Sequence, residues 1–267
     1  MKYINALTIA GTDPTGGAGI QADLKTFSAL GAYGTSVITT LVAQNTCGVQ
    51  CIYYIEPNFV KKQLKSVLDD VRIDTLKIGM LAKSNIVEVI AECLTHTHVP
   101  FIVLDTVMIA KSGDPLLSLD TIGSIRQLLL PKVSLITPNL LEAALLLEDS
   151  VAESETDMLL QGKSLLNLGC KAVLIKGGHL NNAKESPDWL ITRNDQKRFS
   201  TVRVNTRHTH GTGCTLSAAI AALRPRHDGW ISAIAEAKVW LQQALLHAEL
   251  LEVGKGIGPV HHFYNWW

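Results

Sequence analysis

The 267-residue sequence has no net charge, no paired-cysteine motif and no long hydrophobic run. Lys and Arg total 24, and Asp and Glu also total 24, so no overall field attracts nucleic acid or an anionic membrane. The five cysteines are scattered without a Cys-x-x-Cys pair, which disfavours a disulfide framework and a zinc site. No stretch is apolar for long enough to span a bilayer. We therefore expect a soluble cytoplasmic protein with reduced thiols and a small-molecule or protein partner.

The residues that are present form a regular alternation of short apolar runs and amphipathic stretches. The apolar runs predict buried strands over Ile4 to Ala10, Ser36 to Ala43, Leu76 to Leu81, Phe101 to Asp105, Val133 to Thr137 and Ala172 to Lys176. The amphipathic stretches predict helices over Gly16 to Leu30, Pro57 to Val71, Asn85 to Leu94, Thr215 to Leu223 and Ser232 to Val253. This alternation is typical of an α/β fold with a mostly parallel sheet between two helical layers. No linker divides the chain, so we expect residues 1–267 to form a single domain.

One segment breaks this alternation. Residues Trp189 to Arg193 and Arg198 to Val204 flank Asn194-Asp195-Gln196, which predicts a small antiparallel hairpin at an edge of the sheet. The preceding segment, Leu180 to Asp188, is the best candidate for a mobile loop.

A glycine-rich turn, Gly11 to Gly19, follows the first predicted strand. It lacks the Gly-Lys-Ser/Thr ending of a P-loop, and its spacing is not the dinucleotide fingerprint. Ligands of open α/β sheets bind beyond the carboxyl ends of the strands, so we expect this turn to form one side of a small-substrate pocket. Asp23, one helical turn further on, would be a polar contact. The alternative is a tight turn followed by a solvated aspartate.

Polar side chains also follow the other predicted strands. Gln44 carries both a donor and an acceptor, which suits an aminopyrimidine-like ring edge. Asp105 and Glu142 could hold Mg²⁺ as hard oxygen ligands. Asn139 and Glu142 also match a capping box, with Asn at the N-cap and Glu three residues later, and this structural interpretation stays open.

The segment Gly211 to Cys214 runs directly into an alanine-rich helix. The start of a helix has unpaired N–H groups and the positive end of the dipole, so this turn suits an anion. Cys214 lies on the turn, where the dipole favours a thiolate. Lys176, followed by two glycines, can reach a polyphosphate. An ordinary helix start with a buried cysteine is the alternative, but together these parts indicate a phosphoryl transferase.

Four histidines offer a competing metal site. They are not spaced one helical turn apart, and no cysteine or carboxylate completes a motif, so hydrogen-bonded or solvated histidines are the better interpretation of His208, His210, His261 and His262.

An ordered set of motifs resembles the bacterial hydroxymethylpyrimidine/phosphomethylpyrimidine kinases of thiamine biosynthesis, which belong to the ribokinase-like superfamily. The motifs are Ala10 to Asp23, Gln44 to Thr46, Lys77 to Met80, Leu104-Asp105, Thr137 to Asn139 with Glu142, Lys176 to His179, and Thr209 to Cys214. The resemblance covers nearly the whole chain. It implies a ribokinase-like three-layer α/β/α sandwich, a homodimer, and ATP-dependent phosphorylation of 4-amino-5-hydroxymethyl-2-methylpyrimidine to its monophosphate and then to its diphosphate.

The resemblance also implies a role for each matching residue. The pyrimidine would contact Gln44 and Asp23, in a pocket shaped by Gly11, Ala18, Met80 and Val107. Mg²⁺ would be organised by Asp105 and Glu142. The nucleotide would lie along Asn139, Lys176 and Thr209, with Gly211, Thr212, Gly213 and Cys214 forming the anion hole.

The chain departs from the pattern at a few positions. Most of the superfamily has an aspartate base at the end of the anion-hole motif, whereas this subgroup and this chain have Cys214. Thr15 replaces the usual Ser, and His208 stands where Asn is common. Two alternatives stay open: a pyridoxal or pyridoxine kinase of the same superfamily, and a non-catalytic regulator that binds the same ligand.

Overall fold

The computed structural model describes residues 3–108, 116–180 and 184–267. In this part of the chain an eight-stranded sheet has the order β10-β9-β8-β7-β6-β5-β1-β2. Neighbouring strands from β8 to β2 are parallel, whereas β9 and β10 form an antiparallel edge hairpin. The bounds are β1 Ile4–Ala10, β2 Ala32–Ile38, β5 Thr75–Ile78, β6 Phe101–Leu104, β7 Leu135–Ile136, β8 Ala172–Lys176, β9 Glu185–Thr192 and β10 Gln196–Val202.

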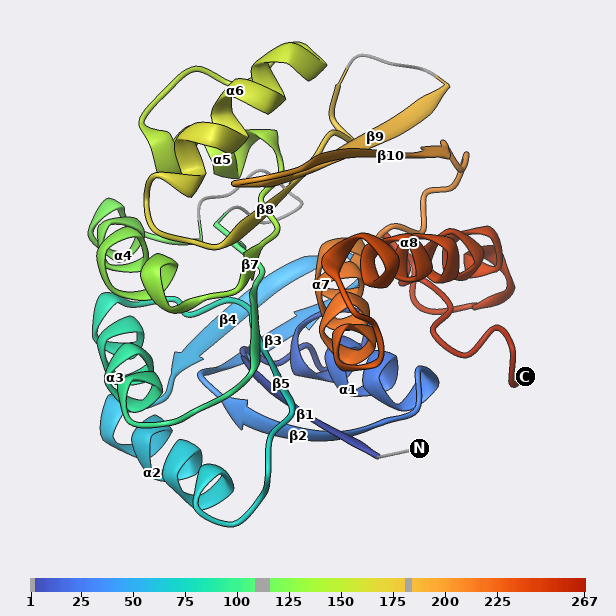
Figure 1. Ribbon diagram of the computed structural model, residues 1–267. Coiled ribbons are helices and arrows are strands. Elements are labelled where there is room, and N and C mark those ends of the chain that lie inside the picture. Colours follow the sequence, from blue (N-terminus) through green and yellow to red (C-terminus); the bar gives the residue numbers. More distant parts are fainter. Residues whose placement is uncertain (1–2, 109–115, 181–183) are drawn as a thin grey trace.

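Helices cover both faces of this sheet (Figure 1). One layer contains α1 (Gly19–Ala29), α7 (Thr212–Leu223) and α8 (Trp230–Leu246). The other contains α2 (Pro57–Leu68), α3 (Ser84–Thr95), α4 (Leu119–Ser124), α5 (Leu140–Leu147) and α6 (Glu155–Leu166). Short helical turns follow α4 at Ile125–Leu129 and Leu130–Lys132, α7 at Arg224–Arg226 and α8 at Ala248–Leu250. The predicted three-layer sandwich with an antiparallel edge hairpin is confirmed.

The alternation of side chains along each strand builds two hydrophobic cores. In β6, Ile102 and Leu104 pack into the core beneath α2 to α6, whereas Val103 packs beneath α7 and α8. This follows because successive strand residues point to opposite faces. All three are buried, which explains why the strand appears in the sequence as a continuous apolar run.

The prediction of one strand over Ser36 to Ala43 is wrong. The chain leaves the main sheet at Thr39, and β3 (Thr40–Asn45) pairs instead with β4 (Gly48–Tyr54) in a separate two-stranded antiparallel sheet. The sequence analysis missed β4 because most of its residues are exposed, so no buried face imposes a hydrophobic period.

Several helix ends also differ from the prediction. Helix α1 begins at Gly19 rather than Gly16, because the N–H groups of Gly17 and Ala18 bind the Asp13 carboxylate instead. Helix α8 ends at Leu246, where His247 bonds back to the Gln243 carbonyl. The loop expected at Leu180 to Asp188 includes residues 181–183, which lie outside the described residues, and its last residues belong to β9.

Candidate active site

The candidate residues gather at the carboxyl-terminal edge of the parallel strands. Gly11 follows β1, Met80 follows β5, Asp105 follows β6 and Asn139 follows β7. Lys176 is the last residue of β8 and forms an isolated bridge with Asn139. Because parallel strands end on the same side, residues distant in sequence meet at this edge, as the sequence predicts.

The start of α7 lies at the segment where the sequence predicts an anion turn. Gly211 caps the helix with φ 73° and ψ 9°, a left-handed conformation that favours glycine. A β-carbon on Gly211 would lie 1.7 Å from the Gly17 carbonyl oxygen, so no other residue fits without moving the backbone. A β-carbon on Gly213 would lie 3.6 Å from Lys176 Nζ and 3.8 Å from Asp105 Oδ2. The turn therefore faces a lysine and a carboxylate.

Lys176 lies between the two predicted metal ligands. Its Nζ atom is 3.3 Å from Asp105 Oδ1 and 3.9 Å from Glu142 Oε2. Both carboxylates are buried. Asp105 Oδ1 also accepts from Thr137 Oγ1 at 3.2 Å. The arrangement concentrates charge of both signs in a region of low dielectric, which strengthens electrostatic interactions with a bound ligand.

These neighbours shift the pKa of each group. Burial alone would raise the pKa of Asp105, but Lys176 and Lys77 outweigh burial and lower it. Burial raises the pKa of Glu142, and the Asp105 charge raises it further. Burial would lower the pKa of Lys176, yet Asp105 and Glu142 raise it. Lys176 is therefore positively charged at neutral pH, as a polyphosphate ligand requires.

Glu142 belongs to a complete capping box. Glu142 N–H donates to Asn139 Oδ1 at 2.9 Å, and Asn139 N–H donates to Glu142 Oε2 at 2.8 Å. Thr106 Oγ1 donates to the same Glu142 oxygen at 3.1 Å. The structural interpretation of this pair is thus confirmed, and it leaves Glu142 oriented toward Lys176.

The donor set fits a hydrated divalent cation better than a site made by protein ligands alone. Asp105 Oδ2 is buried and has no hydrogen-bond partner among the described residues. No group of three or more His, Cys, Asp or Glu suited to a metal occurs within the described ranges. Two carboxylates completed by phosphate oxygens and water are a typical Mg²⁺ environment.

Cys214 differs from the expectation of a thiolate. It is the third residue of α7 and is half-buried. Burial raises the pKa of its thiol to about 11, although the nearby Lys77 ammonium acts in the opposite direction. Burial thus prevails over the Lys77 charge, and the thiol is protonated in the free protein at neutral pH.

On the substrate side, the structure brings together Gly11 and Met80, since a β-carbon on Gly11 would lie 2.9 Å from Met80 Cε. Ala18 is the N-cap of α1, and Gln44 lies on β3, where its amide hydrogen-bonds to Asp13 and helps lower the pKa of that carboxyl. Val107 is half-buried two residues after Asp105. These positions border the same edge of the sheet as the anion turn.

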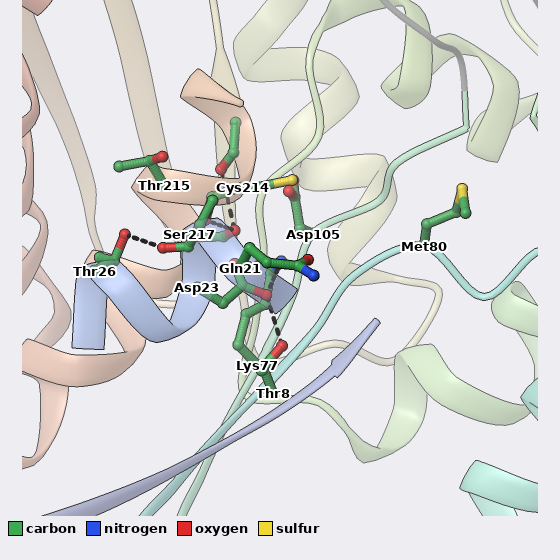
Figure 2. A network of polar contacts seen from close by, with 12 residues as sticks. Thr8, Gln21, Asp23, Thr26, Lys77, Met80, Asp105, Cys214, Thr215 and Ser217 are labelled. Carbon is green, nitrogen blue, oxygen red and sulfur yellow. Dashed lines mark hydrogen bonds and ion pairs between the residues drawn. The ribbon is translucent and has the colours of Figure 1, made fainter. Parts of the chain in front are cut away.

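The sequence predicts a substrate contact for Asp23, and the structure corrects this. Asp23 is fully buried, and its carboxylate oxygens lie 2.9 and 2.8 Å from Lys77 Nζ. Thr8 Oγ1 donates to the same carboxylate at 2.6 Å. Figure 2 shows Asp23, Lys77 and Thr8 together below Cys214. Asp23 therefore pairs with Lys77 in the interior, and its side chain is not exposed to solvent.

Asp13 is a site residue that the sequence analysis missed. Its Oδ1 accepts from Thr15 N at 2.9 Å and Thr15 Oγ1 at 2.7 Å, and its Oδ2 accepts from Gly17 N at 3.1 Å and Ala18 N at 2.8 Å. Burial alone would raise the pKa of Asp13, but hydrogen bonds led by that from His210 hold it well below its usual range. An acidic residue opening a glycine-rich turn was the available signal.

Comparison with known proteins places this site in a family. The family model described as phosphomethylpyrimidine kinase matches residues 13–261. A hydroxymethylpyrimidine/phosphomethylpyrimidine kinase of Salmonella typhimurium is 68% identical over 267 residues, which is 100% of both chains. The Escherichia coli K12 protein of the same name is 66% identical over the same length.

Solved structures agree. The crystal structure of phosphomethylpyrimidine kinase from Clostridium difficile 630 has a TM-score of 0.81 and 39% identity, and covers 91% of this chain and 99% of that one. An ADP complex of Bacillus subtilis pyridoxal kinase has a TM-score of 0.90 and 32% identity, and covers 98% of each chain.

Fold and site together define a kinase with the ribokinase-like fold. Within that class, the chain belongs to the phosphomethylpyrimidine kinase family. No helix in the described part of the chain is both long and apolar enough to cross a membrane.

Proposed function

We propose that this chain phosphorylates 4-amino-5-hydroxymethyl-2-methylpyrimidine to the monophosphate, and then the monophosphate to the diphosphate, for thiamine biosynthesis. One observation carries the proposal: the start of α7 lies beside Lys176 and Asp105, since a β-carbon on Gly213 would be in van der Waals contact with both. This is the arrangement that a transferring phosphoryl group needs, because its catalysis consists mainly of positioning and charge stabilisation. The full-length identity to enzymes of that name supports the choice of acceptor.

The phosphoryl donor is ATP with Mg²⁺. Pyridoxal kinase of Staphylococcus aureus, 30% identical, has been solved with AMP-PCP, which supports nucleotide binding by this fold. Asn139, Lys176 and Thr209 would contact the nucleotide. Asp105 and Glu142 would hold the cation, which neutralises charge on the phosphates when bound. The buried Asp105 Oδ2 atom supports this assignment.

The chain's own groups then act on the reacting atoms. N–H groups of the turn formed by Gly211, Thr212, Gly213 and Cys214 stabilise the charge on the phosphoryl oxygens, and Lys176 adds a positive charge. In the first step the acceptor is the hydroxymethyl oxygen, which must lose its proton. The neutral Cys214 thiol orients this hydroxyl group instead of acting as a preformed base, since its pKa is about 11. In the second step the acceptor is a phosphate oxygen, so no carbon hydroxyl needs deprotonation.

The pyrimidine lies against Gln44, with Gly11, Ala18, Met80 and Val107 shaping the pocket. The Gln44 amide can accept a hydrogen bond from the amino group of the ring and donate one to a ring nitrogen, because it carries both an acceptor and a donor. Gly11 has no side chain, and a β-carbon there would lie only 2.9 Å from Met80 Cε, so the methionine packs directly against the Gly11 backbone.

Substrate selectivity tests this function against the nearest alternative. Purified protein, Mg-ATP and either the hydroxymethylpyrimidine or pyridoxal are incubated separately, and phosphorylated products are quantified by mass spectrometry. We expect kcat/KM for the pyrimidine to exceed that for pyridoxal. A higher value for pyridoxal would make the protein a pyridoxal kinase, and tight pyrimidine binding without turnover of either compound would indicate a regulator.

We further propose that the protein is a cytoplasmic homodimer. The separate sheet of β3 and β4 supports this assembly, because it exposes Leu41, Val49 and Tyr53. Light scattering after size exclusion should give twice the chain mass, and Tyr53→Glu should shift it toward the monomer. A wild-type monomer at all concentrations would contradict the proposed dimer.

A further inference from the structure

His210 joins the glycine-rich loop of residues 13–18 to the turn formed by Gly211 to Cys214. Its Nε2 atom lies 2.7 Å from Asp13 Oδ2, the oxygen that also accepts from the N–H groups of Gly17 and Ala18. A carboxylate only accepts, so Nε2 carries the hydrogen and donates it. The histidine therefore adds a hydrogen bond to the Asp13 carboxylate, which already binds N–H groups in the loop of residues 13–18.

The backbones on either side of this hydrogen bond are in direct contact. A β-carbon on Gly17 would lie 2.6 Å from His210 Cδ2, and one on Gly211 would lie 1.7 Å from the Gly17 carbonyl oxygen. His210 N–H also donates to the Gly258 carbonyl at 3.0 Å. His210 is thus held by a hydrogen bond from its main chain and by another from its ring, and together these fix the position of the side chain.

We propose that His210 is a positioning residue that sets the distance between the acceptor and the phosphoryl group. The inference rests on the proposed kinase function. Ala18, on the loop of residues 13–18, shapes the acceptor pocket, whereas Gly211 to Cys214 hold the phosphoryl group. The His210–Asp13 hydrogen bond couples the two segments. Reaction requires the attacking oxygen about 3–3.5 Å from phosphorus, so loosening this bond misplaces one reactant relative to the other.

The chemistry makes such misplacement measurable. In productive transfer, the acceptor oxygen forms a bond to the γ-phosphorus, the bond from that phosphorus to the β–γ bridging oxygen breaks, and the acceptor proton is released as ADP leaves. If the acceptor is out of line while the anion turn still holds the phosphoryl group, water replaces it and yields ADP and inorganic phosphate. Wild-type protein should form one ADP for each phosphoryl group transferred, that is, one for each monophosphate and two for each diphosphate.

The test compares His210→Leu, which removes the donor, with His210→Gln, which keeps an N–H donor at similar reach. We expect His210→Leu to lower kcat by about 10- to 100-fold, the size of effect typical of a small displacement. KM for ATP should change little, and the ratio of ADP to phosphoryl groups transferred to the pyrimidine should rise. His210→Gln should regain most of the rate and the coupling.

His227 provides a matched control. Its Nε2 atom is also 2.7 Å from a carboxylate oxygen, that of Glu236, and its side chain is 24% exposed against 23% for His210. It lies just before Trp230, which packs on Phe101 at the start of β6, the opposite edge of the sheet. His227→Leu should keep both rate and coupling.

Several results would overturn the inference: wild-type rate and coupling in His210→Leu, no recovery in His210→Gln, or the same uncoupling in His227→Leu. Should His210→Leu fail to fold, His210→Asn, whose shorter amide cannot span the gap, gives the same comparison. A wild-type protein that phosphorylates no pyrimidine would instead refute the proposed function, which separates the two failures.

Discussion

At the scale of single residues, Gly211 combines two constraints: a left-handed backbone, and no room for a β-carbon beside the Gly17 carbonyl oxygen. The sequence predicts a glycine-containing helix start here, but it does not predict the left-handed conformation of Gly211. The second depends on contact with Gly17, which is distant along the chain. No local pattern reports such a contact. The same applies to Asp23, whose buried partner Lys77 lies on a different strand.

Gly211→Ala should therefore disrupt both structure and activity. The left-handed conformation alone costs an L-residue roughly 1–2 kcal/mol, and the clash with Gly17 adds to this. We expect kcat to fall by about 100-fold, as for lost oxyanion donors. Gly123→Ala, in α4 with nothing within 4 Å of its β-carbon, is the control and should leave kcat unchanged. Denaturant unfolding and steady-state kinetics measure both effects; normal kinetics in Gly211→Ala would contradict the role of the turn.

The raised pKa of Cys214 gives a second prediction at this scale. At pH 7.5, which lies far below about 11, the thiol is protonated and should react slowly with iodoacetamide. Cys47 and Cys51 are exposed and should be alkylated first. Peptide mass spectrometry over time gives the order. Alkylation of Cys214 ahead of both would indicate a thiolate and restore the interpretation of a preformed base.

At the scale of elements, prediction succeeds where a strand or helix buries a face. β1 and β8 have the predicted bounds because each is an apolar run buried on both sides. β4 has no buried face, and β7 is reduced to Leu135–Ile136. In α5 the capping interpretation of Asn139 and Glu142 is confirmed, and the metal-ligand interpretation of Glu142 stays a prediction, with Glu142 Oε2 3.9 Å from Lys176 Nζ.

Substitutions at Asn139 can separate these two roles. Asn139→Ala should lower the free energy of unfolding by about 1 kcal/mol, the usual value of an N-cap. Asn139→Asp keeps the cap, but its charge opposes a polyphosphate, so stability should persist while KM for ATP rises. Ser154→Ala is the matched control, because Ser154 and Asp157 form the same box on α6. It should lose similar stability with an unchanged KM for ATP; an unchanged KM in Asn139→Asp would refute the nucleotide contact.

At the scale of the whole molecule, one continuous sheet separates the two cores, and we propose that residues 1–267 unfold as a single domain. The buried Lys77–Asp23 pair lies where β5 meets α1, so it links the sheet to one helical layer (Figure 2). The sequence predicted the layers from periodicity and the site from strand ends. It could not predict how the two glycine-rich turns interlock, because that contact depends on the complete fold.

Lys77→Met leaves the Asp23 carboxylate buried without its cation. Breaking a buried pair from one side typically costs about 3–5 kcal/mol, whereas Lys61→Met, which breaks the solvent-exposed pair with Glu92, should cost far less. Burial raises the pKa of Asp23, so lower pH neutralises this carboxyl. The Lys77→Met deficit should therefore be smaller at pH 5 than at pH 8 in urea unfolding. Equal deficits at both values would contradict this account.

The most direct test of the central claim follows the products of wild-type protein and Cys214→Ala over time, with Mg-ATP and the hydroxymethylpyrimidine, by mass spectrometry. The account predicts monophosphate followed by diphosphate from the wild type. Cys214→Ala should be slower in the first step and close to wild type when supplied with the monophosphate, since only the first acceptor is a hydroxyl. If the wild type forms no phosphorylated pyrimidine, the proposed function is wrong; equal losses in both steps would contradict the role given to Cys214.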